Sequence, residues 1–170
     1  MSERILKALM QLFAIIARPD SNLAERKLVV GSFLKQQLNT ELVNEYIEVF
    51  DDFYKQYQVS DEDSTKKKKR IAGSSVKVLK ICTAINEELT AKQKVIVLTR
   101  LFEFIKSDSE VISDQEIEFV EAVSDTFLIP HDEFVRLKAF ILYDYQTIPN
   151  SSRILIVDNN KDFEHPKVKH

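Results

Sequence analysis

Apolar residues recur every three or four positions along most of this chain, which is the spacing of one face of an α-helix. In the first half, the pattern predicts helices over about residues 3–17, 23–38 and 41–57. Ser2 and Thr40 precede the first and third helices, and serine and threonine are common helix caps. The inward faces that this spacing predicts are Ile5, Leu9, Leu12 and Ile16, then Val30, Leu34 and Leu38, then Val43, Tyr46, Phe50, Phe53 and Tyr57.

Four more helices are predicted in the second half. The fourth starts near Ser75, and the seventh covers about residues 131–143, directly after Pro130. The fifth and sixth start at TAKQ and SDQE, residues 90–93 and 113–116, which both fit the capping box that satisfies two backbone donors. The predicted inward residues are Val78, Cys82 and Ile85, then Val95, Leu98, Leu101 or Phe102 and Ile105, then Ile117, Val120 and Val123 or Ser124, then Phe134, Leu137 and Ile141.

The helical pattern is interrupted once and then ends. Residues 58–75, QVSDEDSTKKKKRIAGSS, lose the periodicity, because an acidic cluster is followed by five consecutive basic residues. We interpret this stretch as a flexible charged loop within one helical domain, residues 1–146. A short extended run at residues 154–157 then belongs to a polar tail. We therefore expect residues 147–170 to be a linker or the start of a following domain, and the chain to be an excerpt of a longer protein.

The composition favours an all-α protein and excludes some partners. The 170 residues include only two glycines and four prolines, so few residues break helices. The formal net charge of −3 gives no overall attraction to nucleic acid, and the basic run KKKKR has no interleaved aromatic residue to stack on bases. The longest uncharged stretch, residues 8–17, is half of the ~20 residues that a membrane-spanning helix needs. We expect neither nucleic-acid binding nor a membrane span.

The chain lacks the residues that several classes of enzyme need. The two glycines, Gly31 and Gly73, are too far apart to build a phosphate-binding loop. No histidine is placed to serve a serine or Cys82 as a base, so a hydrolase is not expected. Cys82 falls on an apolar helix face and is expected in the core, and a single cysteine fits the reducing cytoplasm. We expect no catalytic residue and no organic cofactor.

The two halves of the chain resemble each other. Each has an apolar helix, then an aspartate in a short polar loop, then a second apolar helix; the aspartates are Asp20 in RPDSNLAERK and Asp108 in KSDSEVISDQE. Aligning these two residues places Phe13 on Leu101 and Ile16 on Phe104, and beyond the loop Leu23 falls on Ile112. The pattern indicates an internal duplication of a helical hairpin, with the two acidic turns near one another.

This pattern resembles the TerB-like family of bacterial helical domains, whose hairpins carry a signature close to A-D-G-x-I-x-x-x-E. Asp108, Ile112 and Glu116 match it in the second copy, and Asp20 and Leu23 match it in the first. The resemblance covers roughly residues 5–143 and implies an all-α fold of about seven helices in duplicated hairpins, without catalytic activity. The departures from the signature are Ser21 and Ser109 in place of glycine, one extra residue in the second loop, and Lys27 in place of the first glutamate.

The acidic residues of the two turns have two interpretations. They either bind a metal ion or serve only as turn and cap residues. Carboxylates from two adjacent loops suit Ca²⁺ or Mg²⁺, which prefer oxygen ligands, and the candidate ligands are Asp20, Asp108 and Glu116. The same residue types also occur in turns and caps without any metal, and Glu116 is already part of a predicted capping box. Lys27 removes one negative charge from the set. We expect structural turns, with weak cation binding as the alternative.

A second resemblance concerns the longer protein. Stretches such as LFAIIARPD, LAERKLVVGSFLKQQL and SVKVLKICTAINEELTAKQKVIVL are similar to the segment that precedes the ATPase part in certain large bacterial ABC transporter proteins. This resemblance implies a regulatory or protein-docking module, cytoplasmic and membrane-associated through the rest of the protein. Its partners would be another protein or other domains of the same chain. The rival hypothesis is a divalent-cation sensor.

Overall fold

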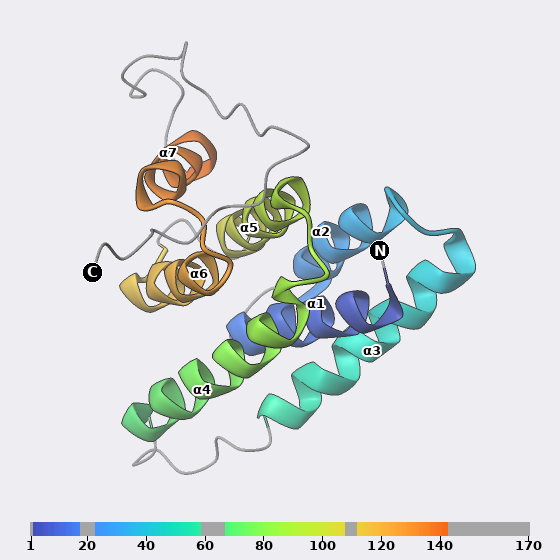
Figure 1. The fold of residues 1–170 in the computed structure, drawn as a ribbon. Coiled ribbons are helices and arrows are strands. Elements are labelled where there is room, and N and C mark those ends of the chain that lie inside the picture. Colours follow the sequence, from blue (N-terminus) through green and yellow to red (C-terminus); the bar gives the residue numbers. More distant parts are fainter. Residues whose placement is uncertain (1, 18–22, 59–66, 108–111, 143–170) are drawn as a thin grey trace.

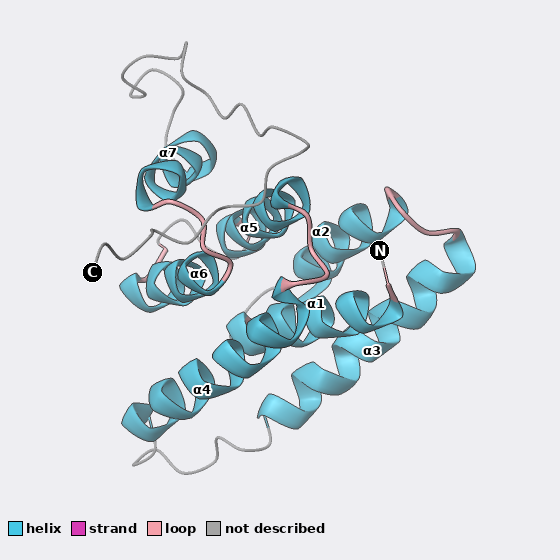
Figure 2. Cartoon of the chain, in the orientation of Figure 1, coloured by secondary structure: helices cyan, strands magenta, loops and turns pink. Residues whose placement is uncertain are grey.

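A computed structural model describes residues 2–17, 23–58, 67–107 and 112–142. This part of the chain is all-α and contains seven helices (Figures 1 and 2). The prediction of an all-α fold is therefore confirmed. The expected extended tail and the domain boundary at residue 146 lie outside the described residues. The helices are α1 Glu3–Ile16, α2 Leu23–Lys35, α3 Thr40–Gln58, α4 Lys67–Asn86, α5 Ala91–Lys106, α6 Asp114–Thr126 and α7 His131–Leu142.

Local capping explains where most of these helices begin. The Ser2 hydroxyl accepts a hydrogen bond from the amide of Ile5, and both predicted capping boxes are present at the starts of α5 and α6. The prediction that Thr40 caps α3 was wrong. Asn39, and not Thr40, caps that helix, because its side-chain oxygen accepts a hydrogen bond of 3.0 Å from the amide of Leu42. Asparagine is at least as good a cap as threonine, so the helix starts one residue earlier.

The charged loop is shorter than the sequence pattern suggested. We expected it to cover residues 58–75, but α3 extends to Gln58 and α4 already begins at Lys67. The helix therefore includes the basic residues at positions 67–70 and Gly73. Lysine, arginine and alanine have high helix propensity, which here outweighs the repulsion among neighbouring cations and the cost of one glycine. Only residues 59–66 remain between the two helices, and they lie outside the described part.

The helices pack around α1. This helix has its most extensive contact with α3 and also contacts α4 and α5 (Figure 1). Counted from the helix that precedes each acidic turn, α1 or α5, the third helix packs against the first in both copies of the repeat, since α3 contacts α1 and α7 contacts α5. The two helices that the proposed duplication relates, α1 and α5, touch one another. This arrangement agrees with a domain built from two related helical units.

The core consists mainly of the predicted helix faces. Cys82 is fully buried on α4, and its burial raises the pKa of the thiol to about 12, so this group is core and not a nucleophile. One face was misjudged on α5, where Val97 is fully buried while Val95 is only partly buried. The reason is that α5 contacts four other helices, α1, α2, α6 and α7, and is covered on more than one side.

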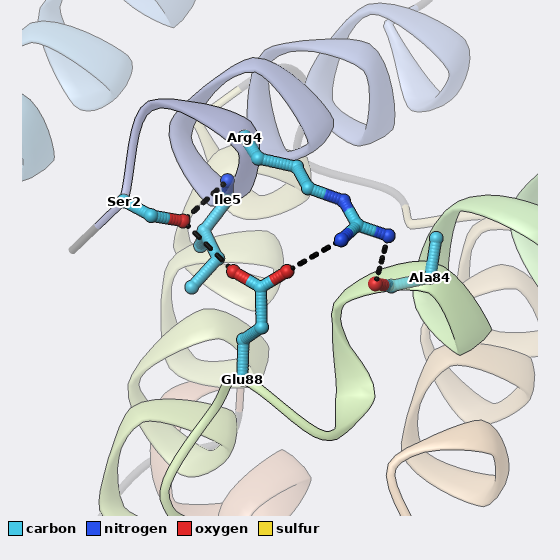
Figure 3. Close-up of polar contacts among 5 residues, drawn as sticks. All are labelled: Ser2, Arg4, Ile5, Ala84 and Glu88. Atoms are coloured by element: carbon cyan, nitrogen blue, oxygen red, sulfur yellow. Dashed lines mark hydrogen bonds and ion pairs between the residues drawn. The ribbon is translucent and has the colours of Figure 1, made fainter.

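A polar network joins the start of α1 to the end of α4 (Figure 3). The Arg4 guanidinium donates to Glu88 Oε1 at 2.8 Å and to the backbone carbonyl of Ala84 at 2.8 Å. The Ser2 hydroxyl donates to the other Glu88 oxygen at 2.9 Å. A cation at the C-terminal end of α4 and an anion at the N-terminal end of α1 both suit the helix dipoles. The network is largely exposed, so it positions the two helix ends more than it stabilises them.

We predict that Gly31→Ala stabilises the protein. Gly31 lies in the middle of α2, where glycine costs about 0.5–1 kcal/mol relative to alanine. A β-carbon at this position would meet Ile47 Cδ1 at 3.9 Å, which is ordinary van der Waals contact. Urea denaturation should show the free energy of unfolding rising by about that amount.

The matched variant for this prediction is Gly31→Leu. Its longer side chain has to displace Ile47 of α3, so it should lower the free energy of unfolding. A loss of stability in Gly31→Ala would show that α2 and α3 lie closer together than described.

Candidate functional site

The three predicted metal ligands are only partly described. Asp20 and Asp108 lie outside the described residues, so their convergence stays a prediction. Glu116 lies in the first turn of α6 and is 5% exposed. Its Oε2 atom accepts hydrogen bonds from the Ser113 amide at 2.9 Å and the Ser113 hydroxyl at 2.8 Å. This carboxylate is thus fixed by the capping box that the sequence predicted.

The segments that flank the two acidic turns meet in the core. Phe13 precedes the first turn, Phe104 precedes the second, and their ring centroids are 5.2 Å apart. Arg26 follows the first turn on α2, and its guanidinium carbon lies 5.0 Å from the centroid of the Phe104 ring. Phe33 and Phe50 complete this aromatic cluster, each with its ring centroid 6.2 Å from one of the other rings. Residues on both sides of the repeat are therefore brought together at the same end of α1 and α5.

Arg26 places a buried positive charge at this end of the domain. Its side chain is 0% exposed, and it is the largest fully buried side chain in the described part of the chain. Arginine cannot lose its proton in a protein, so a permanent positive charge is buried here. The face of Phe104 supplies part of the compensation, since a desolvated cation–π contact contributes about 2 kcal/mol. Such a charge offsets nearby carboxylates and lowers their combined attraction for a metal cation.

A second cation, Lys27, occupies the position of the glutamate in the family signature. Lys27 Nζ lies 2.6 Å from Asp51 Oδ2, and this ion pair connects α2 with α3. Both side chains are partly buried, at 34% and 23% exposure. The first repeat has therefore exchanged a carboxylate for an ammonium group that is engaged with its own partner.

The described residues do not by themselves form a metal centre. Within this part of the chain, no three histidine, cysteine or acidic side chains come together as potential ligands. Besides Glu116, the buried charged side chains here are the two cations Arg26 and Lys94. Asp20 and Asp108 would have to supply the remaining carboxylates of a calcium or magnesium site.

Sequence reasoning missed Arg26, although the pattern contained a signal. Arg26 is spaced three residues after Leu23 and four before Val30, which places it on the inward face of α2. A basic residue at an inward position has to find a buried partner or a ring face. Lys94 was missed in the same way; it lies in the first turn of α5, four residues before Leu98.

The fold and these contacts define a small all-α domain with two related helical units joined at an aromatic cluster. A model of the family described as Tellurite resistance protein TerB matches residues 6–139, and the chain belongs to this family. Searches of curated proteins and of solved structures found no match. None of the described helices is long and apolar enough to cross a membrane. The TerB resemblance inferred from the acidic turns is thereby confirmed.

We predict that Arg26→Ala strongly destabilises the domain. The substitution removes a fully buried side chain, leaves a cavity and abolishes the contact with Phe104. The free energy of unfolding should fall by about 2–4 kcal/mol, measured by urea denaturation.

The matched control is Arg136→Ala on α7. Arg136 is 39% exposed and pairs with Asp132 and Glu133, so its removal should cost less than about 1 kcal/mol. Equal losses in the two variants would mean that Arg26 does not hold the aromatic cluster together.

Proposed function

We propose that this TerB domain is a non-catalytic docking module, and that α2 is its docking element. The observation that carries the proposal is Leu28, whose side chain is 72% exposed, more than any other large apolar residue in the described part of the chain. Burial of an exposed leucine by a protein partner contributes favourable free energy to binding.

The helix that presents Leu28 is held from two sides. Arg26 is fixed over the Phe104 ring of α5, and Lys27 is paired with Asp51 of α3. Both contacts lie within two residues of Leu28, so its backbone is positioned before any partner arrives. A pre-positioned contact residue loses little conformational entropy on binding, which favours affinity.

The partner that we propose is the ATP-binding part of the same longer protein. The stretch LAERKLVVGSFLKQQL, which includes all of α2, is one of those that resemble the segment preceding the ATPase part in large bacterial ABC transporter proteins. In this hypothesis the domain lies in the cytoplasm, is membrane-associated through the rest of that protein, and regulates it by docking.

We predict that Leu28→Glu weakens this docking without unfolding the domain. The domain and the ATP-binding part encoded by the full-length gene would be produced separately and mixed in a titration calorimeter. The variant should raise the dissociation constant about tenfold or more, because a charge is then buried in the interface. Its melting temperature should match that of the parent, since Leu28 is mostly exposed.

Val135→Glu on α7 is the matched control, because Val135 is also an exposed apolar residue, at 43% exposure. It should bind like the parent. A gene without an ATP-binding part, or equal binding by Leu28→Glu and the parent, would refute the proposal.

The second candidate function is a divalent-cation sensor. It is favoured by Glu116, a buried carboxylate in the first turn of α6, two residues after that helix begins. Lys27 and Arg26 oppose it, because each adds a positive charge directly after the first acidic turn. We therefore propose that any binding of Ca²⁺ or Mg²⁺ through Asp20, Asp108 and Glu116 is weak.

We predict that millimolar calcium or a chelator leaves the melting temperature of the parent unchanged, because the fold is held by its apolar core. Asp108→Asn is the informative variant, and Asp132→Asn on α7, an exposed acid, is its control. A calcium-dependent rise in melting temperature that Asp108→Asn abolishes and Asp132→Asn retains would establish the sensor instead.

A further inference from the structure

Four exposed residues lie in a line along the outer side of α2. They are Glu25, Leu28, Ser32 and Lys35. The steps between them are three, four and three residues, which places them on one side of a helix. The opposite side is buried in the core, at Arg26, Val30 and Phe33. The line is therefore a surface that the described part of the chain leaves open.

The spacing of this line is that of a helix-pairing seam. Alternating steps of three and four residues, averaging 3.5, are the repeat by which two helices pack along each other. Leu28 is large and 72% exposed, and the next position, Ser32, is small and exposed. A large residue of one helix packs into the space beside a small residue of its neighbour. The line thus offers both halves of one packing contact.

The two ends of the line carry opposite charges. Glu25 lies in the first turn of α2 and Lys35 in the last turn. They are ten residues apart, about 15 Å along the helix, so they cannot pair with each other. Within the described part of the chain, neither pairs with any other charged side chain. Both charges remain available to a partner.

The size pattern and the charge pattern share one centre of symmetry. Glu25 and Lys35 each lie five residues from Val30, on opposite sides of it. Leu28 and Ser32 each lie two residues from it. A two-fold axis at the level of Val30 therefore brings each acid onto a base and each leucine onto a serine. This self-complementarity selects a second copy of the same helix as the occupant.

We propose that α2 pairs antiparallel with α2 of a second copy of this chain about a two-fold axis. Leu28 then packs over Ser32 of the partner copy, and Glu25 pairs with Lys35 of the partner copy. Each contact occurs twice, as a two-fold interface requires. One helix face is small compared with the ~1,200–2,000 Å² buried by stable interfaces, so the dimer is weak and forms at high protein concentration.

Both flanks of α2 are already held by its own chain. On one flank Lys27 is paired with Asp51 of α3, and on the inner side Arg26 lies over Phe104 of α5. The outer side is thus positioned before a second copy arrives, and pairing needs no rearrangement of the domain. A surface that is ordered in advance loses little conformational entropy on binding.

The dimer covers Leu28, the centre of the docking site proposed above. Docking and dimerisation therefore exclude one another, and the dimer keeps the docking face covered until the ATP-binding part displaces the second copy. This regulatory consequence rests on the proposed function, whereas the dimer itself does not.

The first test is sedimentation velocity of the full chain over a concentration series up to about 1 mM. The parent should change from monomer to dimer as concentration rises. Leu28→Glu should remain monomeric, because it places two like charges beside the two-fold axis. Leu79→Glu on α4, which replaces another exposed leucine, should dimerise like the parent.

The second test exchanges the end charges. Glu25→Lys and Lys35→Glu should each weaken the dimer several-fold, because each brings like charges together twice. The double variant Glu25→Lys/Lys35→Glu should restore dimerisation, since the acid and the base have only changed places. An unrelated protein partner would not produce this rescue.

The third test determines the orientation of the two helices by disulfide trapping. Glu25→Cys and Lys35→Cys would be oxidised in air, separately and as a mixture; the native thiol, Cys82, is fully buried. Antiparallel pairing places the two substituted positions side by side in the mixture, which should form linked dimers. Each variant alone should not, because its two thiols are then about 15 Å apart, beyond the reach of a disulfide.

Four results would overturn the proposal. They are a parent that stays monomeric throughout the series, a dimer that Leu28→Glu leaves intact, a double variant that dimerises no better than the single variants, and linked dimers in each cysteine variant alone. A monomeric parent that still binds the ATP-binding part would refute the dimer and support docking. A dimer that persists in excess ATP-binding part would support the dimer and refute docking at α2.

Discussion

The packing of Phe104 against Phe13, with the Arg26 guanidinium over the Phe104 ring, is the contact on which the rest of the domain depends. It links the end of α1, the start of α2 and the end of α5, so it fixes one half of the chain on the other. A buried cation is costly unless it is compensated, and removing a partner from such a contact leaves that cost uncovered. The same contact brings the residues flanking both acidic turns to one end of the domain.

This constraint also shapes the chemistry available at the turns. Two cations, Arg26 and Lys27, follow the first turn, whereas the buried carboxylate Glu116 follows the second. The two copies of the repeat have thus diverged in charge while keeping the same helical frame. A frame fixed in this way positions side chains such as Leu28 on its surface, and the docking role proposed above uses this feature.

Features that depend on neighbouring residues were predicted correctly. The caps at Ser2, Thr90 and Ser113 and the burial of Cys82 follow from short-range hydrogen bonds and from helical spacing. Features that depend on competition between two local effects were not predicted correctly. Asn39 displaced Thr40 as a cap, and the basic run became helical because propensity outweighed charge repulsion. The candidate ligand Glu116 was correctly expected to be engaged in its capping box.

The sequence by itself determined the helices, most of their inward faces and the family, because these follow from periodicity, capping and the acidic-turn signature. Only the tertiary structure decided which inward positions are truly buried. Val97 replaces Val95 because α5 is covered by four helices, and the buried Arg26 guanidinium lies over the ring of Phe104, which is distant in the sequence. It also decided that α4 leaves Val76 and Leu79 exposed. Such contacts join residues far apart in the chain, and no local pattern specifies them.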